Sequence, residues 1–157
     1  MTIPDAAPGA AAPAPSGAAA AQRVLLFAVA GQVYGCEIDV VREIVPNRRA
    51  TRLPGAPAFV RGLINLRGTL VTVIDLGLRL GRESSVRPES SIVLAEHEGK
   101  LVGVIVDDLM DVQPLLDSQV EPAAERDRGG IVRGLGHLPG LVVVLLDMHA
   151  LVTHVLL

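Results

Sequence analysis

The chain consists of short apolar runs separated by glycine, proline and polar residues. These runs are rich in Val, Ile and Leu, and none shows a long helical period. Short β-branched runs between turn residues predict β-strands, arranged as small barrels. The expected strands are 24–30, 32–37, 39–45, 69–75, 92–95, 100–106, 107–116 and 141–146. We expect few helical segments: one turn at 58–63 and short helices at 76–80 and 148–156.

An internal repeat organises these runs. Residues 61–75 (RGLINLRGTLVTVID) align without a gap with residues 133–147 (RGLGHLPGLVVVLLD) at an offset of 72. Upstream, residues 31–46 (GQVYGCEIDVVREIVP) resemble residues 99–114 (GKLVGVIVDDLMDVQP) at an offset of 68. This duplication predicts two similarly built β-subdomains. Because neither half buries much surface alone, we expect an apolar interface between them.

The repeat also predicts how the chain divides. We expect subdomain 1 at approximately 23–80, a polar linker at 81–91 and subdomain 2 at approximately 92–147, followed by an apolar helix at 148–156. Residues 1–21 are rich in Ala, Pro and Gly and have almost nothing to bury, which is typical of a disordered tail. They lack the basic and continuous apolar regions of a signal peptide.

Composition and charge narrow the possible functions. Half of the residues are hydrophobic, but only two Phe and one Tyr are aromatic, so Val, Leu and Ile must fill the core. The net charge of -3 gives no general electrostatic reason to bind nucleic acid or an anionic membrane. No apolar run is long enough to span a bilayer. The single cysteine, Cys36, has no disulfide partner within the chain, and a reducing cytosol fits it best.

The sequence supports neither catalysis nor a bound cofactor. The four histidines, His97, His137, His149 and His154, are scattered and lack the spacing common in zinc sites. The glycines mark turns and form neither a P-loop nor a dinucleotide-binding fingerprint. No serine lies in a nucleophile elbow, and Cys36 has no evident histidine partner. We therefore expect a non-enzymatic protein with no cofactor and no metal.

A divalent-metal protein is one alternative. Asp107, Asp108 and Asp111 offer the oxygen ligands that hard cations prefer. Charges that protect an edge strand from pairing would produce the same pattern, so both interpretations stay open.

An RNA-binding barrel is a second alternative. Arg48, Arg49 and Arg52 lie in an expected loop at 47–57. Barrels that bind single strands use a basic groove with stacking aromatic residues, and no aromatic residue is interleaved with these arginines.

Differences between the two repeats point to protein–protein contact instead. Four residues of the first repeat recur in the second, and the repeated architecture explains them: Arg61, Gly62, Gly68 and Asp75. Asn65 and Arg67 are replaced by His137 and Pro139, so the architecture does not require them. A guanidinium in this turn can clamp a carboxylate, and Glu43 is a plausible partner. Such an ion pair would be purely structural, or it would orient a surface for a partner, or both.

These residues carry a resemblance to a known family. The stretch 57–81 (PAFVRGLINLRGTLVTVIDLGLRLG) resembles the signature of the CheW-like domain, which contains Asn-Leu-Arg-Gly, an apolar strand and Asp-Leu. The resemblance extends from about Arg23 to the C-terminus and includes LFAVAGQVYG, VREI, VDDLMDV and LLDMHALV. It implies a mainly β fold of two five-stranded SH3-like barrels that share a hydrophobic core, with short helices.

The resemblance also implies a function. Members of this family join the cytoplasmic hairpin tip of a chemoreceptor to the regulatory domain of the histidine kinase CheA, and they can form rings with other CheW-like domains. The chain would then be a stand-alone, non-enzymatic adaptor of chemotaxis signalling. It would be cytoplasmic, held at the membrane-associated receptor array through protein contacts, with no nucleic-acid partner and no direct membrane insertion.

The family's functional positions fall on particular residues of this chain. The implied receptor-binding residues are Val41, Glu43, Ile44, Gly62, Asn65 and Arg67. The implied kinase-binding residues are Asp111 and Val112. In the family, the arginine supports coupling and can pair with the acidic residue. We expect the apolar groove between the subdomains to receive a helical receptor hairpin, while the barrel ends bind kinase.

Two departures from the family pattern favour a further alternative. Thr72 stands where the family commonly has proline, and Gly77 replaces a frequent arginine. These differences indicate an adaptor of a specialised chemosensory pathway, such as type IV pilus control or surface sensing.

Overall fold

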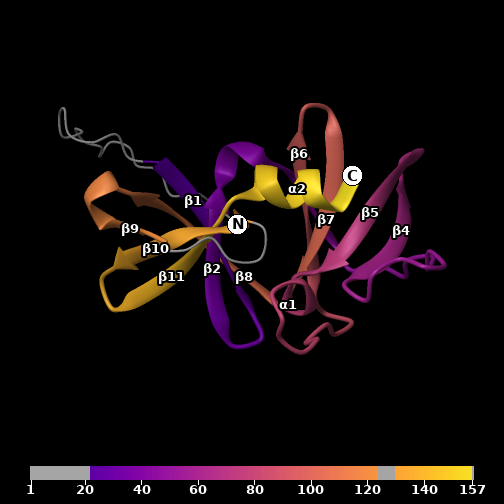
Figure 1. The fold of residues 1–157 in the computed structure, drawn as a ribbon, viewed down its shortest axis with the longest axis horizontal. Helices are drawn as coiled ribbons and strands as arrows, with labels where there is room; N and C mark the ends of the chain where they lie inside the picture. Colours follow the sequence, from indigo (N-terminus) through magenta and orange to yellow (C-terminus); the bar gives the residue numbers. More distant parts are fainter. Residues whose placement is uncertain (1–21, 124–129, 157) are drawn as a thin grey trace.

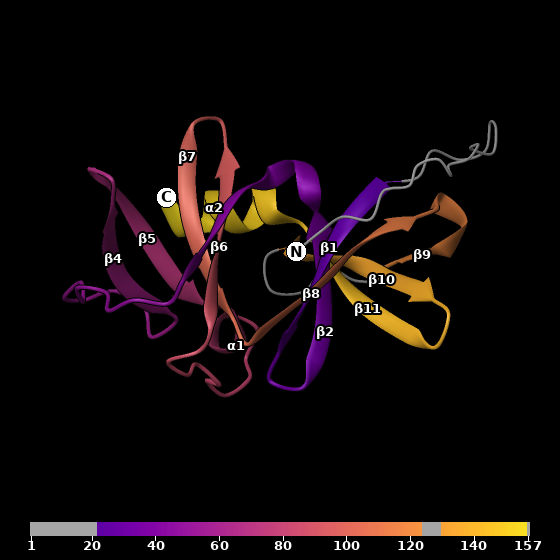
Figure 2. The same ribbon diagram turned by 180° about the vertical axis from the view of Figure 1, so that it is seen from behind.

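The computed structural model describes residues 22–123 and 130–156. The tail expected at 1–21 lies outside the described residues. Within them, eleven strands form two sheets, accompanied by short helical segments (Figures 1 and 2). The expected mainly β class, with two sheets and few short helices, is confirmed.

One sheet has six strands and the other has five. The six-stranded sheet has the spatial order β8 (Asp108–Leu115), β1 (Gln22–Val29), β2 (Gln32–Glu37), β11 (Leu141–Leu146), β10 (Val132–Leu138) and β9 (Val120–Pro122). The five-stranded sheet has the order β3 (Val41–Pro46), β6 (Ser91–His97), β7 (Lys100–Val106), β5 (Thr69–Asp75) and β4 (Val60–Leu66). The α-helices are α1 (Leu76–Arg79) and α2 (Met148–Leu156), and the 3₁₀ turns are η1 (Ile38–Val40) and η2 (Asp117–Gln119).

Each repeat gives its first hairpin to the sheet of the other repeat. The β1–β2 hairpin lies between β8 and β11, and the β6–β7 hairpin lies between β3 and β5. Parallel pairing of β2 with β11, and of β7 with β5, joins each hairpin to strands of the other repeat. The chain crosses between the sheets at η1 and at Asp107, which are equivalent positions in the repeat.

This exchange corrects the expected division into subdomains at approximately 23–80 and 92–147. The β1–β2 hairpin belongs to the sheet of the second subdomain, and the β6–β7 hairpin belongs to the sheet of the first. The segment 81–91 therefore leads from α1, which follows β5, to β6. Both strands belong to the five-stranded sheet. A sequence repeat shows that two units are alike, but not which unit pairs with each hairpin, because that pairing is a long-range contact.

The helical turn expected at 58–63 is wrong, because most of this stretch belongs to β4. Val60, Gly62, Ile64 and Leu66 are buried and alternate with more exposed residues, as in a strand with one face in the core. Glycine at position 62 interrupted the apolar alternation in the sequence. The helices expected at 76–80 and 148–156 are confirmed as α1 and α2.

The core has a shared part and a part inside each sheet. The shared cluster joins both sheets and α2 through side chains such as Phe27, Ile74, Val104 and Leu151, each completely buried. Separate clusters fill the five-stranded and the six-stranded sheets. Burying one such side chain contributes about 1.5–3 kcal/mol. The shared cluster therefore gives the sheets the apolar interface that neither half could supply alone.

Candidate functional site

Arg67 and Gly68 form the two-residue turn between β4 and β5. Both have positive φ angles, 54° and 90°, as a type I′ hairpin turn requires. The Asn65 side chain accepts a hydrogen bond of 2.8 Å from the Gly68 backbone N–H, which stabilises the turn. Ala30 and Glu98 have positive φ at the turns of the β1–β2 and β6–β7 hairpins, so this conformation serves the hairpin and does not by itself mark a binding site.

The turn places Arg67 beside Glu43 of β3, and the two side chains form an ion pair. This pairing, expected from the sequence, is confirmed. Because β3 and β4 are the two edges of the five-stranded sheet, the pair connects the ends of that sheet. The Arg67 side chain is 67% exposed and that of Glu43 is 35% exposed. An exposed ion pair contributes at most about 1 kcal/mol, so this one adds little to the stability of the fold and leaves two charges on the surface.

Apolar side chains flank Glu43 on β3. Ile44 is 39% exposed, whereas Val41 is half-buried and packs against the shared core. A β-bulge between Val41 and Glu43 shifts the pairing of β3 with β6. The edge strand therefore presents an aliphatic side chain next to an ion pair, which is a suitable combination for recognition of a protein surface.

Gly62 lies on β4, facing the segment that follows β3. It is buried, its φ angle is 136°, and an added Cβ atom would overlap the Thr51 carbonyl oxygen. Thr51 and Leu63 exchange two backbone hydrogen bonds of 2.8 Å at this point. The absence of a side chain at position 62 therefore lets the segment after β3 pair with β4.

Asp111 and Val112 lie on β8, an edge strand of the other sheet. The Asp111 carboxylate is exposed and accepts a hydrogen bond of 3.1 Å from the Val112 backbone N–H. Val112 is half-buried, pairs with Leu25 of β1 and packs against the shared core. In the repeat, Asp111 is equivalent to Glu43, so the two expected contact regions occupy equivalent edges of different sheets.

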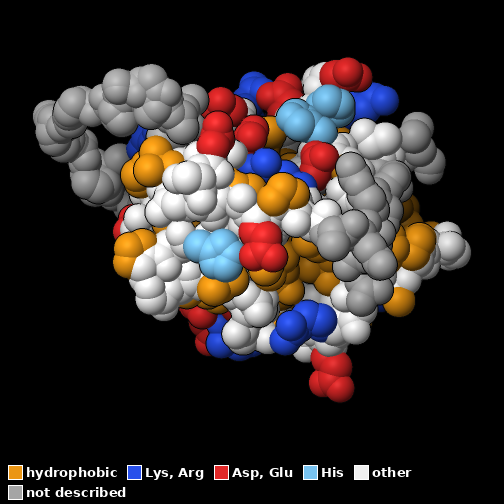
Figure 3. Space-filling model, turned by 60° about the vertical axis from the view of Figure 1, so that its left-hand side comes forward, with side chains coloured by type: hydrophobic (Ala, Val, Ile, Leu, Met, Phe, Trp, Pro, Cys, Tyr) orange, Lys and Arg blue, Asp and Glu red, His pale blue; other side chains and the backbone are white. Residues whose placement is uncertain are grey.

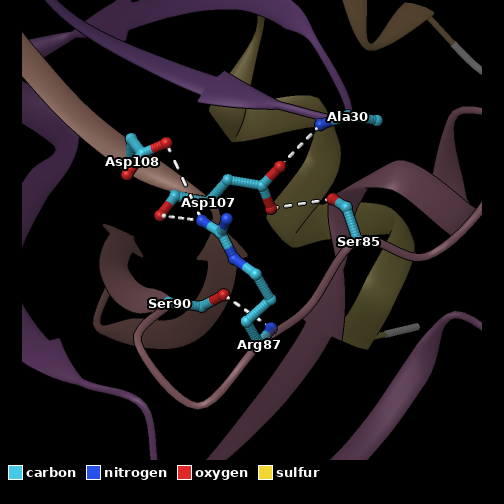
Figure 4. A network of polar contacts seen from close by, with 6 residues as sticks. All are labelled: Ala30, Ser85, Arg87, Ser90, Asp107 and Asp108. Atoms are coloured by element: carbon cyan, nitrogen blue, oxygen red, sulfur yellow. Dashed lines mark hydrogen bonds and ion pairs between the residues drawn. The ribbon is translucent and has the colours of Figure 1, made fainter.

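Asp107 is the centre of a polar network that sequence reasoning did not predict (Figure 4). Its carboxylate accepts hydrogen bonds from the Ala30 backbone N–H at 2.8 Å and from Ser85 Oγ at 2.7 Å. The Arg87 guanidinium donates to the Asp107 carbonyl oxygen at 3.3 Å and lies 3.8 Å from the Asp108 carboxylate. These hydrogen bonds attach the segment 81–91 to Asp107, where the chain passes from one sheet to the other.

These contacts give the acidic residues of the metal hypothesis partners within the chain. Both carboxylate oxygens of Asp107 are used, and Asp108 faces a guanidinium. Among the described residues, no group of three or more His, Cys, Asp or Glu side chains is arranged to hold a metal ion.

The fold also brings together two histidines that are scattered in the sequence. His97, on β6, and His149, on α2, have their Nδ1 atoms 2.5 Å apart and their ring centroids 4.3 Å apart. One ring donates and the other accepts in this contact, which attaches α2 to the β6–β7 hairpin. In Figure 3, adjoining histidine side chains lie at the upper edge of the face, among acidic and basic side chains.

Cys36 is buried in β2, and burial raises the pKa of its thiol to about 12. A thiol that stays protonated at neutral pH is a poor nucleophile and a poor metal ligand. Cys36 therefore acts as a small hydrophobic side chain of the shared core.

Comparisons with known proteins agree with this architecture. Residues 23–156 match the CheW-like domain family. The chain belongs to the CheW-like domain family. It is 31% identical over 142 residues to the chemotaxis protein CheW of Klebsiella aerogenes, covering 88% of this chain and 86% of that protein. It is 32% identical over 134 residues to the chemotaxis protein CheW of Rhizobium meliloti, covering 81% and 84%.

Further relatives extend the comparison. The chain is 33% identical over 88 residues to Protein PilI of Pseudomonas aeruginosa, covering 55% of this chain and 49% of that protein. The crystal structure of the scaffolding protein TtCheW from Thermoanaerobacter tengcongensis matches this CheW-like fold with a TM-score of 0.76 and 30% identity. That match covers 82% of this chain and 90% of the other. Among the described residues, no helix is long and apolar enough to cross a membrane.

Proposed function

We propose that this CheW-like protein is a non-enzymatic adaptor that couples chemoreceptors to a CheA-type histidine kinase in chemotaxis signalling. The observation that carries the proposal is the exposed Arg67–Glu43 ion pair on the sheet edge of a chain that matches the CheW-like domain from residue 23 to residue 156. Relatives named chemotaxis protein CheW, and a scaffolding protein of the same fold, support it.

The receptor surface of this proposal combines β3 with the β4–β5 turn. Ile44 and Val41 supply aliphatic contacts, and Glu43 and Arg67 supply the charged rim against a helical receptor tip. Asn65 keeps the turn in the conformation that positions Arg67. Gly62 acts indirectly, because it permits the pairing of Thr51 with Leu63 of β4.

The kinase surface of this proposal lies on β8, around Asp111 and Val112. The exposed Asp111 carboxylate faces solvent on an edge strand, next to Met110, which is 41% exposed. We expect modest binding at each interface, and ring assembly with further CheW-like domains would strengthen both through multivalency. The protein would act in the cytoplasm, at the receptor array, through protein contacts.

Co-purification with the native receptor and kinase tests this function. The wild-type protein should retain both partners, and Arg67→Glu should lose the receptor while its far-UV circular dichroism stays unchanged. Arg42→Glu is the matched control, because Arg42, like Arg67, is an exposed arginine in an ion pair, but its partner is Glu96 of β6, which is not part of the proposed receptor surface. Retention of both partners by Arg67→Glu, or equal loss in Arg42→Glu, would contradict the assignment of the receptor surface.

A specialised chemosensory pathway, such as pilus control or surface sensing, is the second candidate. The similarity to Protein PilI is the observation that favours it. Identification of the kinase and receptor that co-purify with the tagged protein decides between the two pathways.

A further inference from the structure

Four arginines surround one open hollow in the five-stranded sheet. The hollow has a volume of about 730 Å³ and lies where the 47–52 segment, the start of β4 and α1 meet. Its cationic lining residues are Arg48, Arg49, Arg52 and Arg61. Ala50, Val60 and Leu78 supply aliphatic surface, and no Asp or Glu is among the described residues that line it. This concentration of positive charge occurs in a chain whose net charge is -3.

Within the part of the chain that the structure describes, these four arginines differ from four others in having no acidic partner. Arg42, Arg67, Arg87 and Arg133 each form an ion pair with a carboxylate. Within residues 22–123 and 130–156, no ion pair or side-chain hydrogen bond involves the four guanidinium groups of the hollow. Four adjacent unpaired cations repel one another, so their arrangement favours binding of an anion.

The second repeat shows that the fold does not require three of these cations, Arg48, Arg49 and Arg52. Thr51 pairs with Leu63 beside Gly62, and Glu121 pairs with Leu135 beside Gly134. The segments 48–52 and 118–122 are therefore equivalent in the structure. The second segment reads Ser-Gln-Val-Glu-Pro and has no basic residue. The basic character of the first segment is thus an addition to the shared architecture.

The backbone that presents the arginines is fixed before any ligand binds. Two hydrogen bonds of 2.8 Å join Thr51 to Leu63. At the other end of the segment, the Asn47 backbone N–H donates to the Ser90 carbonyl oxygen at 3.1 Å, and its side chain donates to the Arg87 carbonyl oxygen at 3.0 Å. A ligand would therefore have to order only the arginine side chains, which lowers the entropy cost of binding.

The chemistry of the lining distinguishes between classes of anion. Guanidinium groups bind carboxylates through paired hydrogen bonds, and the aliphatic floor offers contacts to a peptide's methylene groups. Base stacking, which single-stranded nucleic acid requires, has no aromatic partner among the described lining residues. A carboxylate-rich polypeptide is therefore a better match for this hollow than RNA.

We propose that this hollow is a binding site for an acidic peptide segment of a protein partner. Several Asp or Glu carboxylates of the segment pair with Arg48, Arg49, Arg52 and Arg61, while its aliphatic atoms rest on Leu78 and Ala50. The site goes beyond the proposed coupling function, because it includes neither the Arg67–Glu43 pair nor the β8 edge.

Fluorescence anisotropy with short labelled peptides tests this site. The probes are a peptide array with several Glu residues at varied spacing, the same peptides with Gln for Glu, and an oligonucleotide of equal charge. The test variant is Arg49→Glu/Arg52→Glu, and the control is Arg23→Glu/Arg42→Glu, which makes the same change of charge at exposed positions outside the hollow. Circular dichroism verifies that both variants are folded.

We expect at least one acidic peptide to bind more tightly than its Gln counterpart, and the test variant to weaken it by about tenfold or more. The control variant should change the affinity by less than about twofold, because screened, distant charges contribute little. Absence of binding by every acidic peptide would overturn the proposal. So would equal weakening by the control variant, or tighter binding of the oligonucleotide through the same arginines.

Discussion

The hairpins β4–β5 and β10–β11 have the same architecture and different surfaces. At the end of β5, the Asp75 backbone N–H donates to the Phe59 carbonyl oxygen at 2.7 Å. At the end of β11, the Asp147 backbone N–H donates in the same way to the Ile131 carbonyl oxygen at 2.6 Å. Both aspartates also accept a hydrogen bond from the first turn of the following helix. At the turns, however, Arg67 stands in the first hairpin and a proline in the second.

The difference separates residues that maintain the fold from residues available for binding. Asp75, which recurs in both repeats, is 1% exposed, whereas the Arg67 side chain is 67% exposed and has no counterpart in the second repeat. Substitutions at shared positions should therefore affect stability in both repeats. Substitutions at unshared, exposed positions should affect partners instead.

The largest loss of stability is expected from Gly62→Ala and Gly134→Ala. An added Cβ atom would overlap a backbone carbonyl oxygen at each site, that of Thr51 or of Glu121. Backbone has to move in response, so each variant should lose about 2–4 kcal/mol in the free energy of unfolding, measured by urea denaturation.

Gly68→Ala is the matched control for these variants. Gly68 also has positive φ, but nothing lies within 4 Å of an added Cβ atom. Only backbone strain remains, and the loss should be about 1 kcal/mol. If one repeat tolerated alanine at its buried glycine, the equivalence of the two hairpins would be refuted.

A smaller loss, unequal between the repeats, is expected for the capping aspartates. Asp75 is buried and accepts hydrogen bonds from the Leu78 backbone N–H and from Ser84 Oγ at 2.5 Å, whereas Asp147 is half-buried and caps Ala150. Asp75→Ala should lower the free energy of unfolding by about 2–3 kcal/mol and Asp147→Ala by about 1 kcal/mol. Thermal or urea unfolding measures both losses. A larger loss for Asp147→Ala than for Asp75→Ala would show that burial of the aspartate does not determine the loss of stability.

The smallest change in stability at neutral pH is expected at Cys36, whose counterpart in the repeat is Val104. Cys36→Val should alter the free energy of unfolding by about 1 kcal/mol or less. Burial raises the pKa of the Cys36 thiol from its usual 9.0 to about 12, so the thiol ionises in the unfolded chain at a lower pH than in the folded protein.

This pKa shift gives Cys36 a defined pH dependence. Stability of the wild-type protein should fall as the pH rises from about 9 towards about 12, since the unfolded state binds fewer protons there. Cys36→Val should show a shallower fall over the same range. Urea unfolding at several pH values measures this dependence. If the free energy of unfolding fell equally with pH in the wild type and in Cys36→Val, burial would not raise the pKa of the thiol.

Local patterns allowed much of the fold to be predicted. Glycine-marked hairpins, the strand Thr69–Asp75 and both short helices follow from apolar runs and turn residues. The exchange of hairpins did not follow, because a repeat carries no information about which copies pair. β4 was missed because Gly62 replaces an apolar residue in its buried face.

The candidate site was only partly predictable for the same reason. Comparison of the repeats isolated Arg67, and the position of its strand suggested Glu43. The contact between His97 and His149, and that between Ser85 and Asp107, join residues that only the fold brings together. The hollow lined by Arg48, Arg49 and their neighbours likewise depends on the pairing of Thr51 with Leu63.

The most direct test of the central claim is co-purification of receptor and kinase with the charge-swapped variant Glu43→Arg/Arg67→Glu. The swap keeps an ion pair between β3 and the β4–β5 turn, so its stability should match that of the wild type within about 1 kcal/mol. Because the proposed receptor surface presents these charges to a partner, we predict that the folded double variant binds the receptor as poorly as Arg67→Glu does. Full recovery of binding by the swap would show that the pair acts only within the chain, and would contradict the account.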